Sequence, residues 1–169
     1  MLAKHDVKVA HNPVSNMKLA SGILSYKELK ENGITVSLGT DGCASSNDLD
    51  MFGAMKFASL LQKVHTLDPT ILPAKEALEM ATINGAKTMG INAGAIEAGK
   101  LADIILINLR VPELTPANNL TANLVYSAKG SCVDTVICDG KILMENRIVK
   151  GEEEIIDKAT QVAKDLFAR

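Results

Sequence analysis

An apolar, largely β-branched run over residues 34–38 ends in Gly-Thr-Asp-Gly at residues 39–42. Such a run predicts a buried strand, and the glycines that follow permit a tight turn. Asp41 then lies at the C-terminal end of the strand, where parallel α/β folds hold their chemical groups. A carboxylate at this place suits a metal ligand or a general base. The alternative is structural: an aspartate that caps the next helix or closes the turn.

A second strand is predicted over residues 7–10, where residues alternate as in a half-buried strand, and a polar turn follows at residues 11–16. Between the two strands, residues 25–33 predict a short helix. Strand, helix and strand in this order form a parallel unit, so the carboxyl ends of both strands meet at one edge of the sheet. His11 and Asp41 are therefore expected at the same edge.

Three motifs together point to a known family: HNPVSNMKLASG from residue 11, LGTDG from residue 38 and NDLDMF from residue 47. Segments 74–86 and 94–103 add to the likeness. The sequence resembles the amidohydrolase superfamily, and within it the methylthioadenosine and S-adenosylhomocysteine deaminases, whose neighbours include triazine chlorohydrolases and guanine deaminases. The resemblance covers nearly the whole chain.

Members of that family carry a His-x-His pair on the first barrel strand, two more histidines on middle strands and a glutamate that shuttles protons. Here the histidines are His5, His11 and His65, and no two of them stand one residue apart. A complete (β/α)₈ barrel typically needs ~250 residues, whereas this sequence has 169. The resemblance therefore implies an α/β fold: the C-terminal portion of a (β/α)₈ metal-dependent hydrolase barrel, followed by a small β domain and a terminal helix.

Residues 1–90 are expected to form the last two βα units of the barrel, and residues 91–169 a small β domain with a C-terminal helix. Helices are predicted over residues 47–64, 73–86 and 152–169, and strands over residues 101–107, 133–138, 141–144 and 147–150. Asp139 and Gly140 stand between two apolar runs and predict a hairpin turn. The last helix carries one apolar stripe, and we expect it to dock on a core rather than on a membrane.

The resemblance implies a divalent zinc or iron ion and the hydrolytic deamination of a heteroaromatic substrate, namely an adenosine-type thioether or a related purine or triazine. Asp41 would bind the metal with one oxygen and accept a proton with the other. His11 is not among the family's metal ligands. Together with Ser15 and Asn16 it is expected to contact the substrate or to shape the loop around the site, and an ordinary tight turn is the alternative interpretation.

One carboxylate and scattered histidines do not make the three or four ligands that a metal site needs. This chain by itself is therefore expected to hold no metal and to be inactive. Two other hypotheses stay open: a non-catalytic assembly module, and one half of a split enzyme whose other polypeptide supplies the first barrel strands.

A net charge of −2 provides no basic surface, which excludes nucleic acid as a main partner. The three cysteines lack Cys-x-x-Cys spacing, so we expect a reduced, cytoplasmic setting without disulfides or a zinc ribbon. No apolar run nears the ~20 residues of a membrane span, and no membrane partner is expected. Unpaired edges on the two parallel strands favour a homo-oligomer, or an interface with the missing N-terminal half of the barrel.

Overall fold

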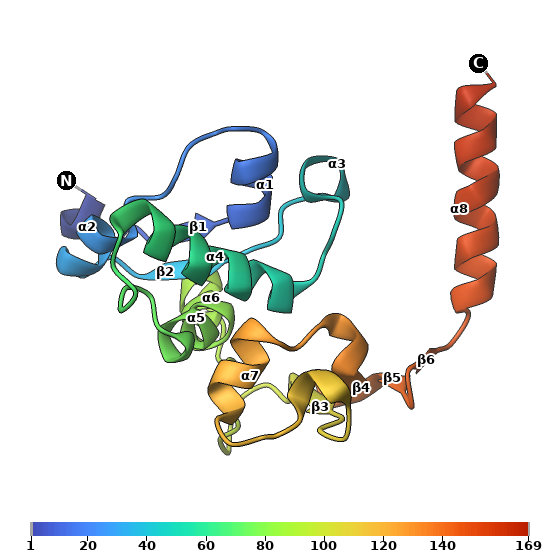
Figure 1. Ribbon diagram of the computed structural model, residues 1–169. Helices are drawn as coiled ribbons and strands as arrows, with labels where there is room; N and C mark the ends of the chain where they lie inside the picture. Colours follow the sequence, from blue (N-terminus) through green and yellow to red (C-terminus); the bar gives the residue numbers. More distant parts are fainter. Residues whose placement is uncertain (1, 169) are drawn as a thin grey trace.

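The computed structural model describes residues 2–168 and shows a mixed α/β chain (Figure 1). The first part contains β1 (Val9–His11), α1 (Pro13–Lys18), α2 (Tyr26–Glu31), β2 (Val36–Leu38), α3 (Cys43–Ser46), α4 (Met51–Thr66), α5 (Ala74–Ala81) and α6 (Ile83–Met89). The second part contains β3 (Ile104–Ile107), α7 (Leu120–Tyr126), β4 (Val133–Cys138), β5 (Lys141–Glu145), β6 (Ile148–Val149) and α8 (Glu152–Phe167). Single-turn 3₁₀ helices occupy Leu2–His5, Pro112–Leu114 and Gly130–Cys132.

The parallel unit predicted at the start of the chain is present. β1 pairs with β2 in parallel, with Val9 opposite Val36 and His11 opposite Leu38. The strands are shorter than predicted, but the pairing continues for one more bond, because the Gly39 amide donates to the His11 carbonyl at 2.9 Å. Both polar loops therefore leave the sheet at the same edge.

Two predicted helices differ in their bounds. α4 begins at Met51 instead of residue 47, because Asp50 is its N-cap and accepts a hydrogen bond from the Phe52 amide. The helix predicted over 73–86 is two helices, α5 and α6, which meet at Thr82 with φ −122° and ψ −93°. The Thr82 hydroxyl donates to the Leu78 carbonyl at 2.7 Å. After this break, the Asn84 amide group donates to the Val36 carbonyl at 3.0 Å and ties α6 to β2.

One hydrophobic core joins the two parts of the chain. Its buried members come from β2, α4 and α5 and equally from α7 and the segments around it; they include Val36, Phe52, Met55, Met80, Leu114, Val125 and Cys132. The Ser59 hydroxyl on α4 and the Tyr126 hydroxyl on α7 lie 2.9 Å apart across this contact. The two parts on either side of residues 90 and 91 thus differ in topology but share a core. Their division into two separate domains stays a prediction.

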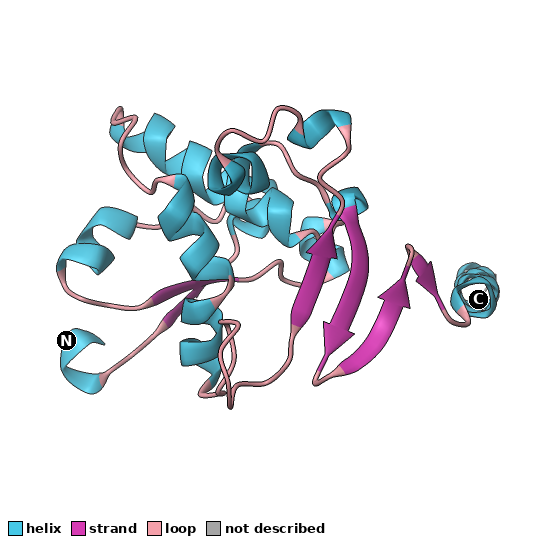
Figure 2. Ribbon diagram, turned by 90° about the horizontal axis from the view of Figure 1, so that it is seen from below, coloured by secondary structure: helices cyan, strands magenta, loops and turns pink. Residues whose placement is uncertain are grey.

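The second part forms a four-stranded antiparallel sheet in the order β3-β4-β5-β6 (Figure 2). Asp139 and Gly140 both have positive φ, 48° and 73°, as the predicted Asp-Gly hairpin requires. A second two-residue turn, Asn146–Arg147, also has positive φ at both positions. The Arg147 guanidinium donates to the Ser131 and Val133 carbonyls at 2.7 and 2.8 Å, which anchors that turn to the start of β4.

The C-terminal helix forms as predicted, but its predicted docking is wrong within the described residues. No residue of α8 is buried, and the helix stands apart from the rest of the chain (Figure 1). The short β6 and Gly151, which has φ 80°, lead the chain away from the sheet before the helix starts. Across residues 2–168, no helix has both the length and the hydropathy to cross a membrane.

Candidate functional site

The two strand ends bring Ser15 and Asp41 into contact. Ser15 lies on α1, directly after β1, and Asp41 follows β2. The Ser15 hydroxyl donates to Oδ2 of Asp41 at 2.7 Å, across 26 residues of sequence. Gly39 permits this close approach of the two loops, because a Cβ at this position would lie 2.4 Å from Oδ1 of Asn12.

The Asp41 carboxylate is exposed to solvent, and each of its oxygens accepts a hydrogen bond. Besides Ser15 on Oδ2, the Gly42 amide donates to Oδ1 at 2.8 Å. The hydrogen bond from Ser15, followed by those from Gly42 and the Ser45 hydroxyl, lowers the pKa of the Asp41 carboxyl below its ordinary value. The carboxylate is therefore charged at neutral pH and held in one orientation.

The structural alternative for Asp41 is met only in part. Gly42, not Asp41, is the N-cap of the following helix α3, and no side chain caps that helix. The Gly42 hydrogen bond does help to close the turn, and Asp41 adopts the left-handed conformation with φ 61°. A left-handed aspartate that caps nothing leaves its carboxylate available, since one or more lone pairs on each oxygen are not used.

His11 and Asn16 make no hydrogen bond to Asp41 within the described residues. His11 is 2% exposed, and its opposite residue in the register, Leu38, belongs to the core. Opposite residues on paired strands point to the same face, so His11 faces the helices. Burial lowers the pKa of its imidazole to about 4, and Nε2 has no hydrogen-bond partner. Asn16 is half-buried on α1, and its backbone amide donates to the Asn12 carbonyl.

Ser45 is the contact of Asp41 that the sequence analysis did not identify. It stands four residues after Asp41 on α3 and contributes to the lowered pKa of the Asp41 carboxyl, while its hydroxyl donates to the Gly42 carbonyl at 3.1 Å. The spacing of polar residues after a strand end was the only cue.

Among the described residues, Asp41 is the candidate metal ligand that the strand ends present. No group of three or more His, Cys, Asp or Glu side chains with suitable geometry occurs among residues 2–168. Asp41 fits a divalent cation as a single ligand, because it is charged, exposed and fixed in orientation. A complete site would need two or three further ligands from outside this chain.

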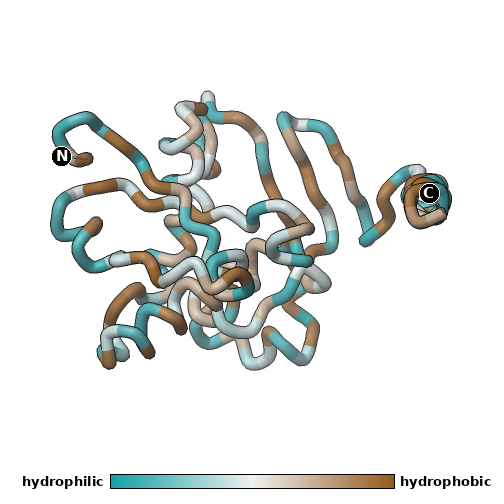
Figure 3. Tube along the Cα trace, turned by 90° about the horizontal axis from the view of Figure 1, so that it is seen from above, coloured by the Kyte–Doolittle hydropathy of each residue, from teal (hydrophilic) through white to brown (hydrophobic). Residues whose placement is uncertain are grey.

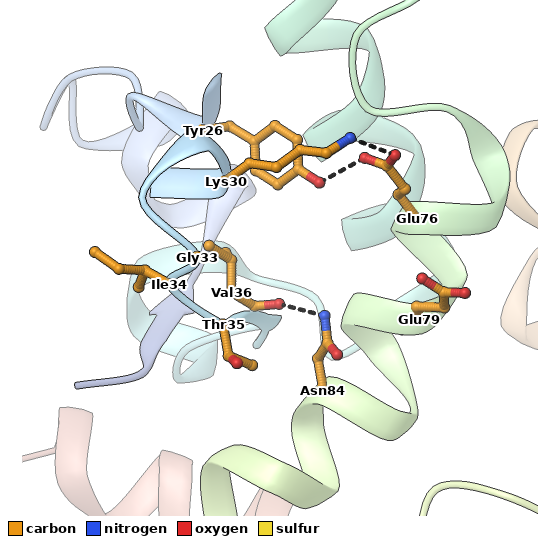
Figure 4. Close-up of a pocket in the computed structure, with 9 residues that line it drawn as sticks. All are labelled: Tyr26, Lys30, Gly33, Ile34, Thr35, Val36, Glu76, Glu79 and Asn84. Carbon is orange, nitrogen blue, oxygen red and sulfur yellow. Dashed lines mark hydrogen bonds and ion pairs between the residues drawn. The ribbon is translucent and has the colours of Figure 1, made fainter. Parts of the chain in front are cut away.

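A pocket of about 250 Å³ lies at the other end of β2 (Figure 4). Its lining residues include Gly33–Val36, which lead into the strand, whereas Asp41 follows the strand's exit. The Tyr26 hydroxyl donates to Oε2 of Glu76 at 2.7 Å, and Lys30 pairs with the same carboxylate. These contacts join α2 to α5. The pocket is therefore part of the helix packing and separate from the candidate site.

Comparisons with known proteins place the chain in a family. The family model described as "Amidohydrolase family" matches residues 1–143. A 5'-deoxyadenosine deaminase of Methanosarcina acetivorans is 51% identical over 100% of this chain and 40% of its own length. A 5-methylthioadenosine/S-adenosylhomocysteine deaminase of Thermococcus onnurineus is 54% identical over 87% of this chain and 35% of its own.

Solved structures give the same result. A zinc-bound adenosine deaminase from Xanthomonas campestris matches 99% of this chain and 39% of its own, with 34% identity and a TM-score of 0.94. A zinc complex of an atrazine chlorohydrolase from Arthrobacter aurescens matches 94% of this chain and 36% of its own, with 26% identity and a TM-score of 0.87.

The chain thus spans between 35% and 40% of the length of these relatives. The matched portion is their C-terminal part, which confirms the predicted fold class. The residues of this chain that the family model matches, 1–143, include both strand ends and the whole candidate site. The chain belongs to the amidohydrolase family.

Proposed function

We propose that this chain supplies the C-terminal part of a metal-dependent aminohydrolase that removes an amino group, by hydrolysis, from an adenosine-type substrate. The observation that carries the proposal is the Asp41 carboxylate, charged and oriented by Ser15 at the exit of β2. The substrate class follows from the relatives, whose names are 5'-deoxyadenosine deaminase and 5-methylthioadenosine/S-adenosylhomocysteine deaminase.

Asp41 has two roles in this proposal. One carboxylate oxygen would hold the divalent cation, zinc or iron, and the other would accept the proton that water loses as it attacks the heteroaromatic ring. When bound, the metal lowers the pKa of water so that hydroxide is available near neutral pH. An asparagine could still offer one oxygen, but its amide nitrogen could not accept the proton.

Ser15 and Ser45 would act through Asp41. Their hydroxyls, with the Gly42 amide, favour the ionised carboxylate, so that it is available both to the metal and to the proton. The contact with α1 also limits rotation of the carboxylate, and this keeps the accepting oxygen turned toward the reaction.

The remaining metal ligands and the proton shuttle would come from the part of the fold that the longer relatives carry. The unpaired outer edges of β1 and β2 are the surface along which that part would pair, because a two-stranded parallel sheet leaves backbone donors and acceptors free on both sides. A homo-oligomer along the same edges is the alternative arrangement.

The test joins this chain to the N-terminal part of the Methanosarcina acetivorans relative and compares Asp41 with Asp41→Asn. Turnover of 5'-deoxyadenosine, measured as ammonia release, should fall by the ~10²–10⁴ that general acid-base catalysis contributes. Bound zinc should fall only in part, because one oxygen ligand remains. Ser15→Ala should lower turnover by a smaller factor.

Asp68→Asn is the matched control, since Asp68 also accepts two hydrogen bonds, both from Thr70, in the turn after α4. It should leave turnover unchanged. Turnover close to that of the parent in Asp41→Asn would show that the carboxylate serves only the turn.

A further inference from the structure

The apolar stripe of α8 is exposed along its whole length. Ile155, Ile156, Val162 and Leu166 are between 56% and 66% exposed, and no residue of the helix is buried. Figures 2 and 3 show the helix end-on, beyond the last strand of the sheet and apart from the rest of the chain. Burial of these apolar side chains against a partner would be favourable.

The stripe has the spacing of a docking seam. Ile155, Ala159, Val162 and Leu166 follow one another at intervals of four, three and four residues, which places them on one face. Most of the stability of a helix in a protein comes from packing of its apolar face, and no residue of this 16-residue helix is buried. The seam therefore needs a partner surface for the helix to persist.

The charges of α8 argue against a lipid surface as that partner. Its polar side carries the acidic residues Glu152, Glu153, Glu154, Asp157 and Asp165, against the two lysines Lys158 and Lys164. Helices that bind anionic membranes are rich in Lys and Arg on the polar face. An acidic polar face with a narrow apolar seam fits a protein surface better.

The Xanthomonas campestris structure matches almost the whole of this chain. The match covers 99% of this chain, so it includes α8, while it covers 39% of that longer chain. The helix therefore keeps its place relative to the rest of these residues in a protein that has more than half of its chain elsewhere.

We propose that the seam of α8 docks on the part of the amidohydrolase fold that the longer relatives carry and that this sequence does not include. This inference rests on the proposed function. Figure 1 shows α8 and the β1–β2 pair on opposite sides of the described chain. A segment that pairs with the strand edges and also binds the seam of α8 would be held at two distant places. We call this second contact, between the α8 seam and that segment, the clasp.

The experiment uses two pieces. The N-terminal part of the Methanosarcina acetivorans relative, up to the start of the matched segment, carries an affinity tag and is co-expressed with this chain. The variant Val162→Asp/Leu166→Asp places two charges on the seam, and association of the pieces, measured by titration, should weaken at least ~100-fold. The variant Thr160→Asp/Gln161→Asp adds the same two charges outside the seam and should associate as the parent does.

Four outcomes separate the possibilities. Equal association of the seam variant and the parent overturns the clasp. A seam-dependent dimer of this chain, seen by light scattering without association of the tagged piece, also overturns it. Seam-dependent association without turnover of 5'-deoxyadenosine in the presence of zinc supports the clasp and contradicts the proposed function. Seam-dependent association with turnover supports both. Because α8 buries nothing in this chain, its variants should keep the parent's thermal transition.

Discussion

At the scale of single residues, His11 is the clearest case of a polar side chain that is buried without full compensation for its lost hydration. It is almost fully buried at the end of β1, and burial lowers the pKa of its imidazole to about 4 from an ordinary value near 6.5. The imidazole is therefore neutral in the folded chain at pH 7. Nε2 lacks a partner, so protonation would create an uncompensated buried charge.

We predict a loss of stability between pH 6.5 and about 4 that depends on His11. In this window the unfolded chain binds a proton at His11 and the folded chain does not, so the free energy of unfolding decreases as the pH falls. The total loss should be on the order of 3 kcal/mol. Urea unfolding at a series of pH values measures it.

His11→Gln should remove most of that pH dependence. His65→Gln, on the exposed side of α4, is the control and should leave it unchanged. The same slope in His11→Gln and the parent would show that other groups cause the loss.

At the scale of elements, two glycines predict opposite effects of one substitution. Gly140 has φ 73° in the turn between β4 and β5, a conformation that costs a residue with a Cβ roughly 1–2 kcal/mol. Gly53 lies in α4, where a Cβ would meet Cβ of Asp50 at an ordinary 3.9 Å. Gly140→Ala should lower the free energy of unfolding by about 1 kcal/mol, and Gly53→Ala should raise it by about 0.5–1 kcal/mol. Chemical denaturation of both variants checks the signs, and a shared sign would contradict this account.

Local rules predicted most elements and failed where distant residues decide. The Asp-Gly hairpin and the parallel strand pair follow from patterns within a few residues. The break at Thr82 does not, because its compensation is the bond from Asn84 to Val36, 48 residues away. The docking of α8 is not met within the described residues for a related reason: an apolar stripe predicts that a surface is covered but not by which segment.

The candidate site follows the same rule. The position of Asp41 at a strand end could be predicted from the run before it, and Ser15 was expected near the loop. The bond from Ser15 to Oδ2 depends on the register of β1 and β2 and on the missing side chain at Gly39, which only the folded chain reveals. Ser45 was missed because its spacing after the strand end, the one cue in the sequence, is weak for a lone serine in a polar loop.

At the scale of the whole molecule, the shared core predicts that residues 2–90 and 91–133 unfold together. Leu114 is fully buried in the core from the second part, so Leu114→Ala should cost about 2–5 kcal/mol. Leu106→Ala, at a position that is 51% exposed, should cost far less. The two tyrosines, Tyr26 in α2 and Tyr126 in α7, report one part each.

Fluorescence of the variants Tyr26→Phe and Tyr126→Phe leaves one reporter at a time. The remaining tyrosine should report a single unfolding transition in each variant. Adding Leu114→Ala should shift the midpoint of that transition by the same amount in both. Two separate transitions would mean that the parts are independent domains.

The hydrogen bond from Ser15 couples the order of α1 to whatever Asp41 binds. Since α1 must be formed for Ser15 to reach Oδ2, a cation that prefers the oriented carboxylate also favours the formed helix. The coupling is reciprocal. Fraying of residues 13–18 would weaken binding of a cation to Asp41 by the same free energy that the bound cation adds to the folding of these residues. In the proposed site, the local stability of one six-residue helix would thus set part of the cation affinity, although the helix contributes no ligand.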